Sequence, residues 1–342
     1  MRGSDKEIDR ARLWYLLYVC DHHFSIAYGR PPVTHENEAI THHEMFLGLG
    51  SPRITESDVR LQSQVGVFKI LSRIFQEFGT DSANTLSEEQ LESVGKYNSD
   101  LDTWRTHWES RLSEWLTFAS TSHPLISIEQ NDFIGDYPAR GVILHCHFAK
   151  VQLNALVLRG FQFTAESMSA NRQHYANLAI SSAIRTLEVV LNEPHVRQSV
   201  VGVPLYLTTL ISLSTLFLLK VQLTWKNLRL NVNGPVVMDL LERIVLLLQE
   251  AKASHRHLAP HIAQGLGNML AKFKSSQMHG AAEQGPPMLV HPQSLPPIQD
   301  TGSWQQVHMG NAMYGDIMSM YGLDEQYFPL GIFDALPAQM PS

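Results

Sequence analysis

The stretch RARLWYLLYVCDHHFSIAYGRPP, residues 10–32, has the pattern of one long helix with a fixed end. Apolar residues recur at helical spacing, which predicts one apolar face: Leu13, Leu17, Cys20, Phe24 and Ala27, with Trp14 and Leu16 widening it. Gly29 fits the position after a helix C-terminus, and the two prolines that follow forbid continuation. We therefore expect a core helix, packed into a bundle by Trp14, Leu17 and Phe24.

The same helical pattern continues to about residue 275, so the predicted fold class is all-α. Residues 55–58 (TESD) and 87–90 (SEEQ) each have the sequence of a helix N-terminus. Between residues 104 and 115, three Trp and one Leu recur at spacings of four, four and three, which is typical of a buried stripe. Further helices are expected over residues 142–160, 165–191, 235–253 and 260–273. Strand-like alternation does not extend beyond a few residues.

One uncharged run, SVVGVPLYLTTLISLSTLFLL at residues 199–219, is long enough to cross a bilayer. It contains Pro204 and five hydroxyl residues between Thr208 and Thr215, and the flanking sequence is patterned like a helical domain. A helix that is apolar on all sides is also typical of the centre of a large helical protein. We favour a buried core helix and expect no membrane partner.

Composition changes sharply at residue 277, which divides the chain into a helical domain (1–276) and a tail (277–342). The tail holds six acidic residues, eight of the 17 prolines and no Lys or Arg. Its prolines prevent a packed element, so we expect it to be disordered. Within residues 314–338, acids alternate with large apolar side chains, as in transcriptional activation segments.

The candidate activation residues are Ile317, Tyr321, Leu323, Asp324, Tyr327, Phe328, Ile332, Phe333, Asp334 and Leu336. Acidic repulsion would keep these aromatics exposed, so that they dock into a partner's groove as a transient helix. A tail that folds back onto the helical domain is an equal alternative at this point.

Catalytic and metal-binding patterns are absent from the sequence. It has no HExxH, CxxC, Gly-rich phosphate loop or GxSxG. On a helix, His145 and His147 point in different directions, and Cys20, His22 and His23 spread around the axis. We therefore expect neither an enzyme nor a metal site. No block of basic residues indicates nucleic-acid binding, and two cysteines favour a reducing compartment.

The opening stretch resembles the motif of the fungal-specific transcription factor domain, the middle homology region of fungal binuclear zinc-cluster (six-cysteine) transcription factors. The matching positions are Arg12, Leu13, Trp14, Tyr18, Asp21, Ser25, Gly29, Arg30, Pro31 and Pro32, followed by two acids of the next loop, Glu36 and Glu38. The helix expected over residues 142–160 is similar to a later family helix that bears His. No catalytic residue and no metal ligand comes with these positions.

The resemblance implies the regulatory and activation portion of a nuclear factor that controls RNA polymerase II transcription, of carbon- or protein-catabolic genes. It also implies transcription machinery or co-regulators as partners of the tail, a small-molecule inducer between helices, and a homodimer. The family's zinc cluster needs six cysteines and this chain has two. We therefore expect no cofactor here, DNA binding only through a missing N-terminal module, and a chain that is a fragment or a truncated gene product.

Two expectations concern the motif itself. Asp21 and Arg30 should hold the turn after the helix through a charge-assisted bond, rather than catalyse. The alternative function is a helical ligand-binding or protein-interaction module without transcriptional activity.

Overall fold

The computed structural model describes residues 5–27, 32–48, 54–79, 85–122, 137–160, 168–202, 206–224, 228–253 and 257–282. Every regular element within these ranges is a helix, which confirms the predicted all-α fold. The elements are α1 (Asp5–Ala27), α2 (Glu38–Thr41), η1 (His43–Gly48), α3 (Glu56–Phe78), α4 (Glu88–Ser122), α5 (Tyr137–Ala155), η2 (Leu156–Leu158), α6 (Ala170–Asn192), α7 (Pro194–Gln198), α8 (Tyr206–Thr224), α9 (Gly234–Glu250) and α10 (Leu258–Ala282).

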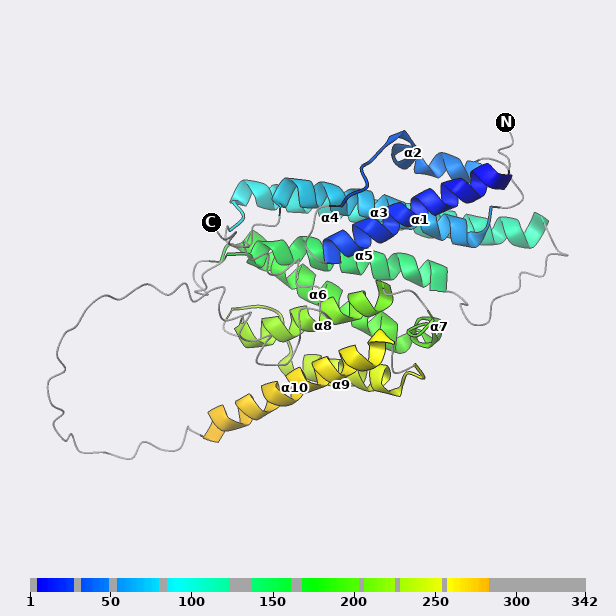
Figure 1. Ribbon diagram of the computed structural model, residues 1–342. Coiled ribbons are helices and arrows are strands. Elements are labelled where there is room, and N and C mark those ends of the chain that lie inside the picture. The colour runs from blue at the N-terminus through cyan, green and yellow to red at the C-terminus, as the bar shows by residue number, and fades with distance from the viewer. Residues whose placement is uncertain are drawn as a thin grey trace, which may run out of the picture.

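The helices are stacked, with α1, α3 and α4 on one side and α9 and α10 on the other (Figure 1). Between them lie α5 and α6, which pack against each other. Because α5 also packs on α3 and α4, it connects the two sides of the stack. Helix α1 lies at an outer edge and packs against α3, so part of its surface has no covering helix among the described elements.

Two strongly apolar helices are buried in this stack. The segment Arg140–Leu158 is long and apolar enough to cross a membrane by length and composition, but 83% of it is buried inside the protein. The run predicted as a buried core helix overlaps α8, where Leu210, Ile211 and Phe217 are almost fully buried. Its hydroxyl groups are accommodated inside the helix, as when Ser212 Oγ donates to the Thr208 carbonyl at 2.8 Å. Packing of α6, α9 and α10 around α8 explains its composition.

Local sequence signals place several helix ends where they were predicted. At the start of α3, the Asp58 carboxylate accepts hydrogen bonds from the Thr55 backbone N–H (2.7 Å) and hydroxyl (3.0 Å). At the start of α4, Ser87 and Gln90 form a capping box. The predicted apolar stripe of α4 is in the core, where Trp108 is 1% exposed and Trp104 donates from Nε1 to the Ser63 carbonyl at 3.0 Å.

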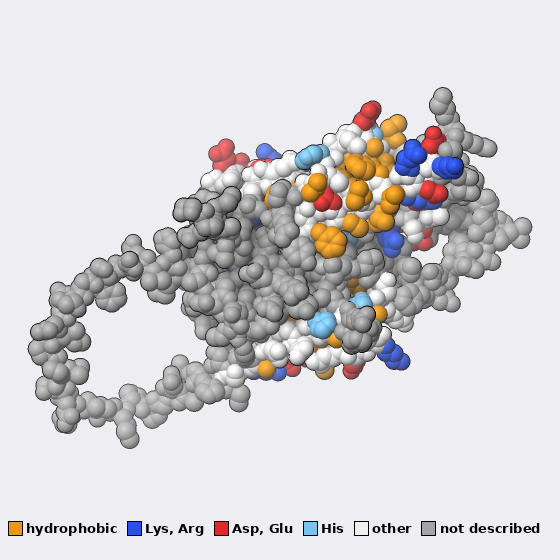
Figure 2. Space-filling model, viewed as in Figure 1, with side chains coloured by type: hydrophobic (Ala, Val, Ile, Leu, Met, Phe, Trp, Pro, Cys, Tyr) orange, Lys and Arg blue, Asp and Glu red, His pale blue; other side chains and the backbone are white. Residues whose placement is uncertain are grey.

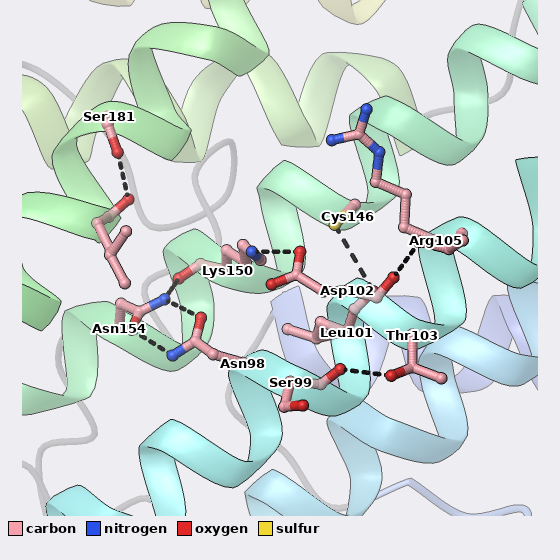
Figure 3. A network of polar contacts seen from close by, with 12 residues as sticks. Asn98, Ser99, Leu101, Asp102, Thr103, Arg105, Cys146, Lys150, Asn154 and Ser181 are labelled. Carbon is pink, nitrogen blue, oxygen red and sulfur yellow. Dashed lines mark hydrogen bonds and ion pairs between the residues drawn. The ribbon is translucent and has the colours of Figure 1, made fainter.

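A buried pair of amides joins α4 to α5. Asn98 and Asn154 donate to each other's side-chain oxygens at 2.8 and 3.0 Å (Figure 3). Each amide also donates to a carbonyl of its own helix, so both amide groups are hydrogen-bonded in the core. Nearby, Lys150 forms an ion pair with Asp102 at 2.6 Å. These contacts fix the register of the two helices.

Several helix bounds differ from the sequence-based expectation. The helix predicted over residues 260–273 is α10, which spans Leu258–Ala282 and so continues past residue 276. Helix α6 begins at Ala170, where the Ser169 hydroxyl accepts from the Arg172 backbone N–H, rather than at residue 165. Composition indicates that a segment is helical, but the residues at which the helix begins and ends depend on local caps, such as Ser169 at the start of α6.

Candidate functional site

The face of α1 that packs on the protein is the one opposite to the predicted face. Its almost fully buried residues include Tyr15, Tyr18, Val19, His22 and His23. In contrast, Leu13, Leu17 and Phe24 are 67%, 51% and 40% exposed. The prediction that Leu17 and Phe24 pack the helix into the bundle is therefore wrong, and Trp14 is only partly buried against the core.

Apolar side chains on both sides of α1 explain this error, because their spacing fits either face. The side of α1 that carries Tyr15 and Tyr18 is the one buried against the rest of the protein. The Tyr15 ring meets Phe46 of η1 edge-on at 5.5 Å between centroids, and its hydroxyl donates to the Ala39 carbonyl at 3.3 Å. His23 likewise meets Phe68 of α3 edge-on. The buried face of α1 thus consists largely of Tyr and His side chains, which combine an apolar ring with polar atoms.

Arg12 joins α1 to the start of α3. Its Nε and Nη2 donate to the two carboxylate oxygens of Asp58, both at 2.8 Å, in a bidentate ion pair. The Asp58 side chain is 4% exposed and also caps the N-terminus of α3, so one carboxylate stabilises the start of α3 and anchors α1. The hydrogen bond with Asp58 raises the pKa of Arg12. The motif singled out Arg12, but nothing in the sequence identified Asp58, 46 residues away, as its partner.

Asp21 holds the loop that follows α1. Its Oδ2 accepts hydrogen bonds from the backbone N–H of Val33 (2.9 Å) and from the backbone N–H (2.7 Å) and hydroxyl (2.6 Å) of Thr34. Burial raises the pKa of Asp21, but these hydrogen bonds outweigh it, so the pKa lies below its ordinary value. The partner proposed for Asp21, Arg30, lies outside the described residues, as do Gly29 and Pro31. Pro32 is half-buried at the start of the described loop.

Replacing Asp21 by alanine should lower the free energy of unfolding by about 2 kcal/mol, because three charge-assisted hydrogen bonds are lost. Asp21→Asn should lose less, since one amide oxygen can still accept. Urea unfolding measures both, with Glu36→Ala in the same loop as the exposed control. Because the pKa of Asp21 is lowered in the folded protein, the advantage of wild type over Asp21→Asn should be complete above about pH 4 and should be lost as the pH falls below it. Equal stabilities of Asp21→Ala and Glu36→Ala would contradict this role.

The buried rings of Tyr18 and His22 pack against each other beneath this loop. Their rings lie 3.8 Å apart between centroids, and His22 Nδ1 lies 3.0 Å from the Tyr18 carbonyl and 3.3 Å from the Thr34 hydroxyl. Burial raises the pKa of Tyr18 and lowers the pKa of His22, so both are uncharged near neutral pH. Cys20 is exposed on the other side of the helix, so Cys20 and His22 do not converge on one substrate.

Histidines are concentrated in the core around α1, α3 and α5. His23, His43 and His145 are each at most 5% exposed, and His145 Nδ1 lies 2.5 Å from the Gly141 carbonyl. Burial holds the pKa of His145 at about 4, far below its ordinary value. Among the residues that the structure describes, no three His, Cys, Asp or Glu side chains come together as metal ligands.

A cavity of about 660 Å³ lies where the ends of α6 and α9 meet α7. Its walls are apolar at Leu191, Val200 and Leu247, and its charged lining residues are Arg197, Lys252 and Glu250. Its volume falls within the range of small-molecule sites.

All ten candidate activation residues of the tail, Ile317 to Leu336, lie outside the described residues. Their proposed role rests on the amino-acid composition of the tail.

Comparison with known proteins gives one informative similarity. Over 286 residues, 83% of the chain, the sequence is 44% identical to the transcriptional activator of proteases prtT of Emericella nidulans. The matched region is 42% of that activator's length, so the chain spans less than half of this relative. No family model matches the chain, and no solved structure matches it. Over most of its length, the chain is thus similar to one part of a fungal transcriptional activator.

Proposed function

We propose that this chain is the regulatory and activation portion of a fungal transcription factor that acts in the nucleus on genes of protein breakdown. The single observation that carries the proposal is the 44% identity over 83% of the chain to a transcriptional activator of proteases. That relative is named as an activator and not as an enzyme. The ion pair of Arg12 with Asp58, the burial of Tyr18 and the hydrogen bonds of Asp21 to the following loop support a structural role for the motif, in agreement with a regulatory domain.

The tail supplies the activating part of this proposal. Residues 314–338 contain four acids, no Lys or Arg, and large apolar side chains between the acids. Such a segment fits the grooves of transcription machinery or co-regulators, where its aromatics are buried and its acids remain in water.

We assign DNA binding to a separate module of the whole factor, in keeping with the family resemblance. A binuclear zinc cluster needs six cysteine ligands, and Cys20 and Cys146 are the two cysteines of this chain. Cys146 is buried against the Leu101 carbonyl, so it is not placed as a metal ligand. Our proposal therefore involves no zinc chemistry within the helical domain.

A reporter assay tests activation by the tail. Residues 283–342, which begin after α10, are fused to a heterologous DNA-binding domain, and reporter expression is measured. We expect activation that falls at least tenfold in the triple variant Tyr321→Ala, Phe328→Ala, Phe333→Ala, because these aromatics make the contacts with the partner. The matched control removes three apolar side chains from the Pro-rich part of the same tail: Leu289→Ala, Val290→Ala and Leu295→Ala. The control should activate like wild type.

Silence of the wild-type fusion at a normal protein level would contradict the proposal. It would favour a helical ligand-binding or protein-interaction module without transcriptional activity.

A further inference from the structure

The cavity of about 660 Å³ where the ends of α6 and α9 meet α7 combines apolar walls with charged side chains. We call it the α7 cavity. Among its wall residues, Val200 is 2% exposed and Leu247 is 8% exposed, so these walls belong to the hydrophobic core. An apolar cavity with a few polar groups is the usual form of a small-molecule site.

Three charged side chains line the α7 cavity: Arg197, Glu250 and Lys252. All three are exposed, and none of them forms an ion pair within the part of the chain that the structure describes. Glu193, just before α7, is already paired with Arg140 at 3.3 Å. The charged lining therefore consists of two positive groups and one negative group.

Other charged positions of the protein are paired. On α9 and α10, Lys274 Nζ lies 2.7 Å from a carboxylate oxygen of Glu242. At the N-terminal end of α1, basic and acidic side chains lie beside each other (Figure 2), and Arg12 pairs with Asp9 and Asp58. Because the charges of the α7 cavity have no such partner among the described residues, they are available to the charged groups of a ligand.

The signs of these charges select the chemical class of the ligand. Arg197 and Lys252 favour a carboxylate, because both donate charge-assisted hydrogen bonds. Glu250 favours an ammonium group, and it is the last residue of α9, where free backbone carbonyls add partial negative charge. A purely anionic ligand would be repelled by Glu250. A ligand with one carboxylate, one ammonium group and an apolar body complements the whole lining.

A short peptide of apolar residues has all three parts. A single apolar amino acid has the same end groups, but it is far smaller than the drug-sized molecules that occupy cavities of this volume. In a peptide, several bonds separate the ammonium from the carboxylate, so the two ends can reach charges at different places in the cavity.

We propose that the α7 cavity binds short apolar peptides with free ends, with the carboxylate at Arg197 and Lys252, the ammonium at Glu250 and the side chains against the apolar walls. The regulatory meaning rests on the proposed function: proteases release such peptides, so a factor that controls protease genes binds a product of the enzymes it induces. The binding itself is measured without transcription.

Isothermal titration calorimetry of the full chain with the tripeptide Leu-Ala-Leu tests this proposal. The same peptide is titrated with an acetylated N-terminus, which removes the ammonium, and with an amidated C-terminus, which removes the carboxylate. We expect each blocked peptide to bind about tenfold more weakly than the free tripeptide, because one charge-assisted interaction is lost. No binding of the free tripeptide at millimolar concentration would overturn the proposal. Equal affinity for all three peptides, or tighter binding of the acetylated one, would overturn it as well.

Variants of the lining show which groups hold the two ends of the peptide. Glu250→Gln should weaken binding of the free tripeptide about tenfold and leave the affinity for the acetylated peptide unchanged, because that peptide lacks the ammonium. The double variant Arg197→Gln, Lys252→Gln should likewise weaken the free tripeptide and spare the amidated one. Equal losses for free and blocked peptides would mean that these residues do not hold the ends.

Matched controls remove the same charges outside the α7 cavity. Asp239→Asn removes an exposed acid of α9, and the double variant Arg243→Gln, Lys274→Gln removes two exposed positive charges. Both should bind the free tripeptide like wild type, and thermal unfolding without peptide checks that every variant is folded. Peptide binding with a silent tail in the reporter assay would keep this proposal and reject activation by the tail. No binding with an active tail would do the opposite.

Discussion

Replacing Arg12 by alanine is expected to lower the free energy of unfolding by about 3 kcal/mol, because it leaves the buried carboxylate of Asp58 without its cationic partner. Arg12 donates two hydrogen bonds of 2.8 Å to this carboxylate, whose side chain is 4% exposed. After the substitution, Asp58 keeps the hydrogen bonds from Thr55, but its charge remains out of water. Urea unfolding at pH 7 measures the loss.

Two further variants separate the ion pair from general effects of cutting a long side chain. Arg10→Ala removes an exposed Arg one half-turn away and should change stability by no more than about 0.5 kcal/mol. Arg12→Lys keeps the charge but cannot form the bidentate ion pair with Asp58, so its loss of stability should be intermediate. A loss for Arg12→Ala no larger than that for Arg10→Ala would show that the pair does not hold α1 on α3.

Lowering the pH from about 7.5 to about 5 is expected to remove most of the folding free energy. Burial lowers the pKa of His23 to about 3 and those of His43, His145 and His147 to about 4. Histidines of the unfolded chain titrate near their ordinary pKa of about 6.5. The unfolded chain therefore binds protons between about pH 6.5 and pH 4 that the folded protein does not, and stability falls as pH falls. Each group accounts for roughly 2 kcal/mol at pH 5.

Summed over four histidines, this loss approaches the whole stability of an ordinary domain. Urea unfolding at several pH values measures it. His23→Phe keeps an aromatic ring beside Phe68 and should retain about 2 kcal/mol more of its stability than wild type between pH 7.5 and pH 5. His42→Gln, at an exposed position, should follow wild type. Parallel curves for wild type and His23→Phe would mean that His23 does not titrate in this way.

Local signals in the sequence were sufficient for the fold class and for several helix ends. The cap residues Thr55 and Ser87 act within three residues of themselves, so their spacing determines their hydrogen bonds. Of the predicted stripe of α4, Trp104, Trp108 and Leu112 are buried in the core, and Trp115 is partly buried against it. Such features depend on the nearest turns of the chain.

Features that depend on distant contacts were not predicted. The bond from Arg12 to Asp58 and the choice of buried face on α1 both require knowledge of how α1 meets α3. Asp21 bonds to Val33 and Thr34 across a loop whose path the sequence does not specify. A helix that is apolar on two sides gives two equally good periodicities, and only the packing partner selects between them.

The motif residues of α1 thus serve mainly to place the helix. Arg12 binds Asp58 at the start of α3, Tyr18 is buried in the core, and Asp21 fixes the following loop, so α1 is held in a defined position.

The most direct test of the proposed function is the transcript level of protease genes in the native fungus. The chromosomal gene is altered to carry Tyr321→Ala, Phe328→Ala and Phe333→Ala, and transcripts are compared with those of wild type and of the Leu289, Val290, Leu295 alanine control. Our account predicts at least a tenfold fall in protease transcripts for the first variant only, with the protein at its normal level. Unchanged protease transcripts in that variant would contradict it.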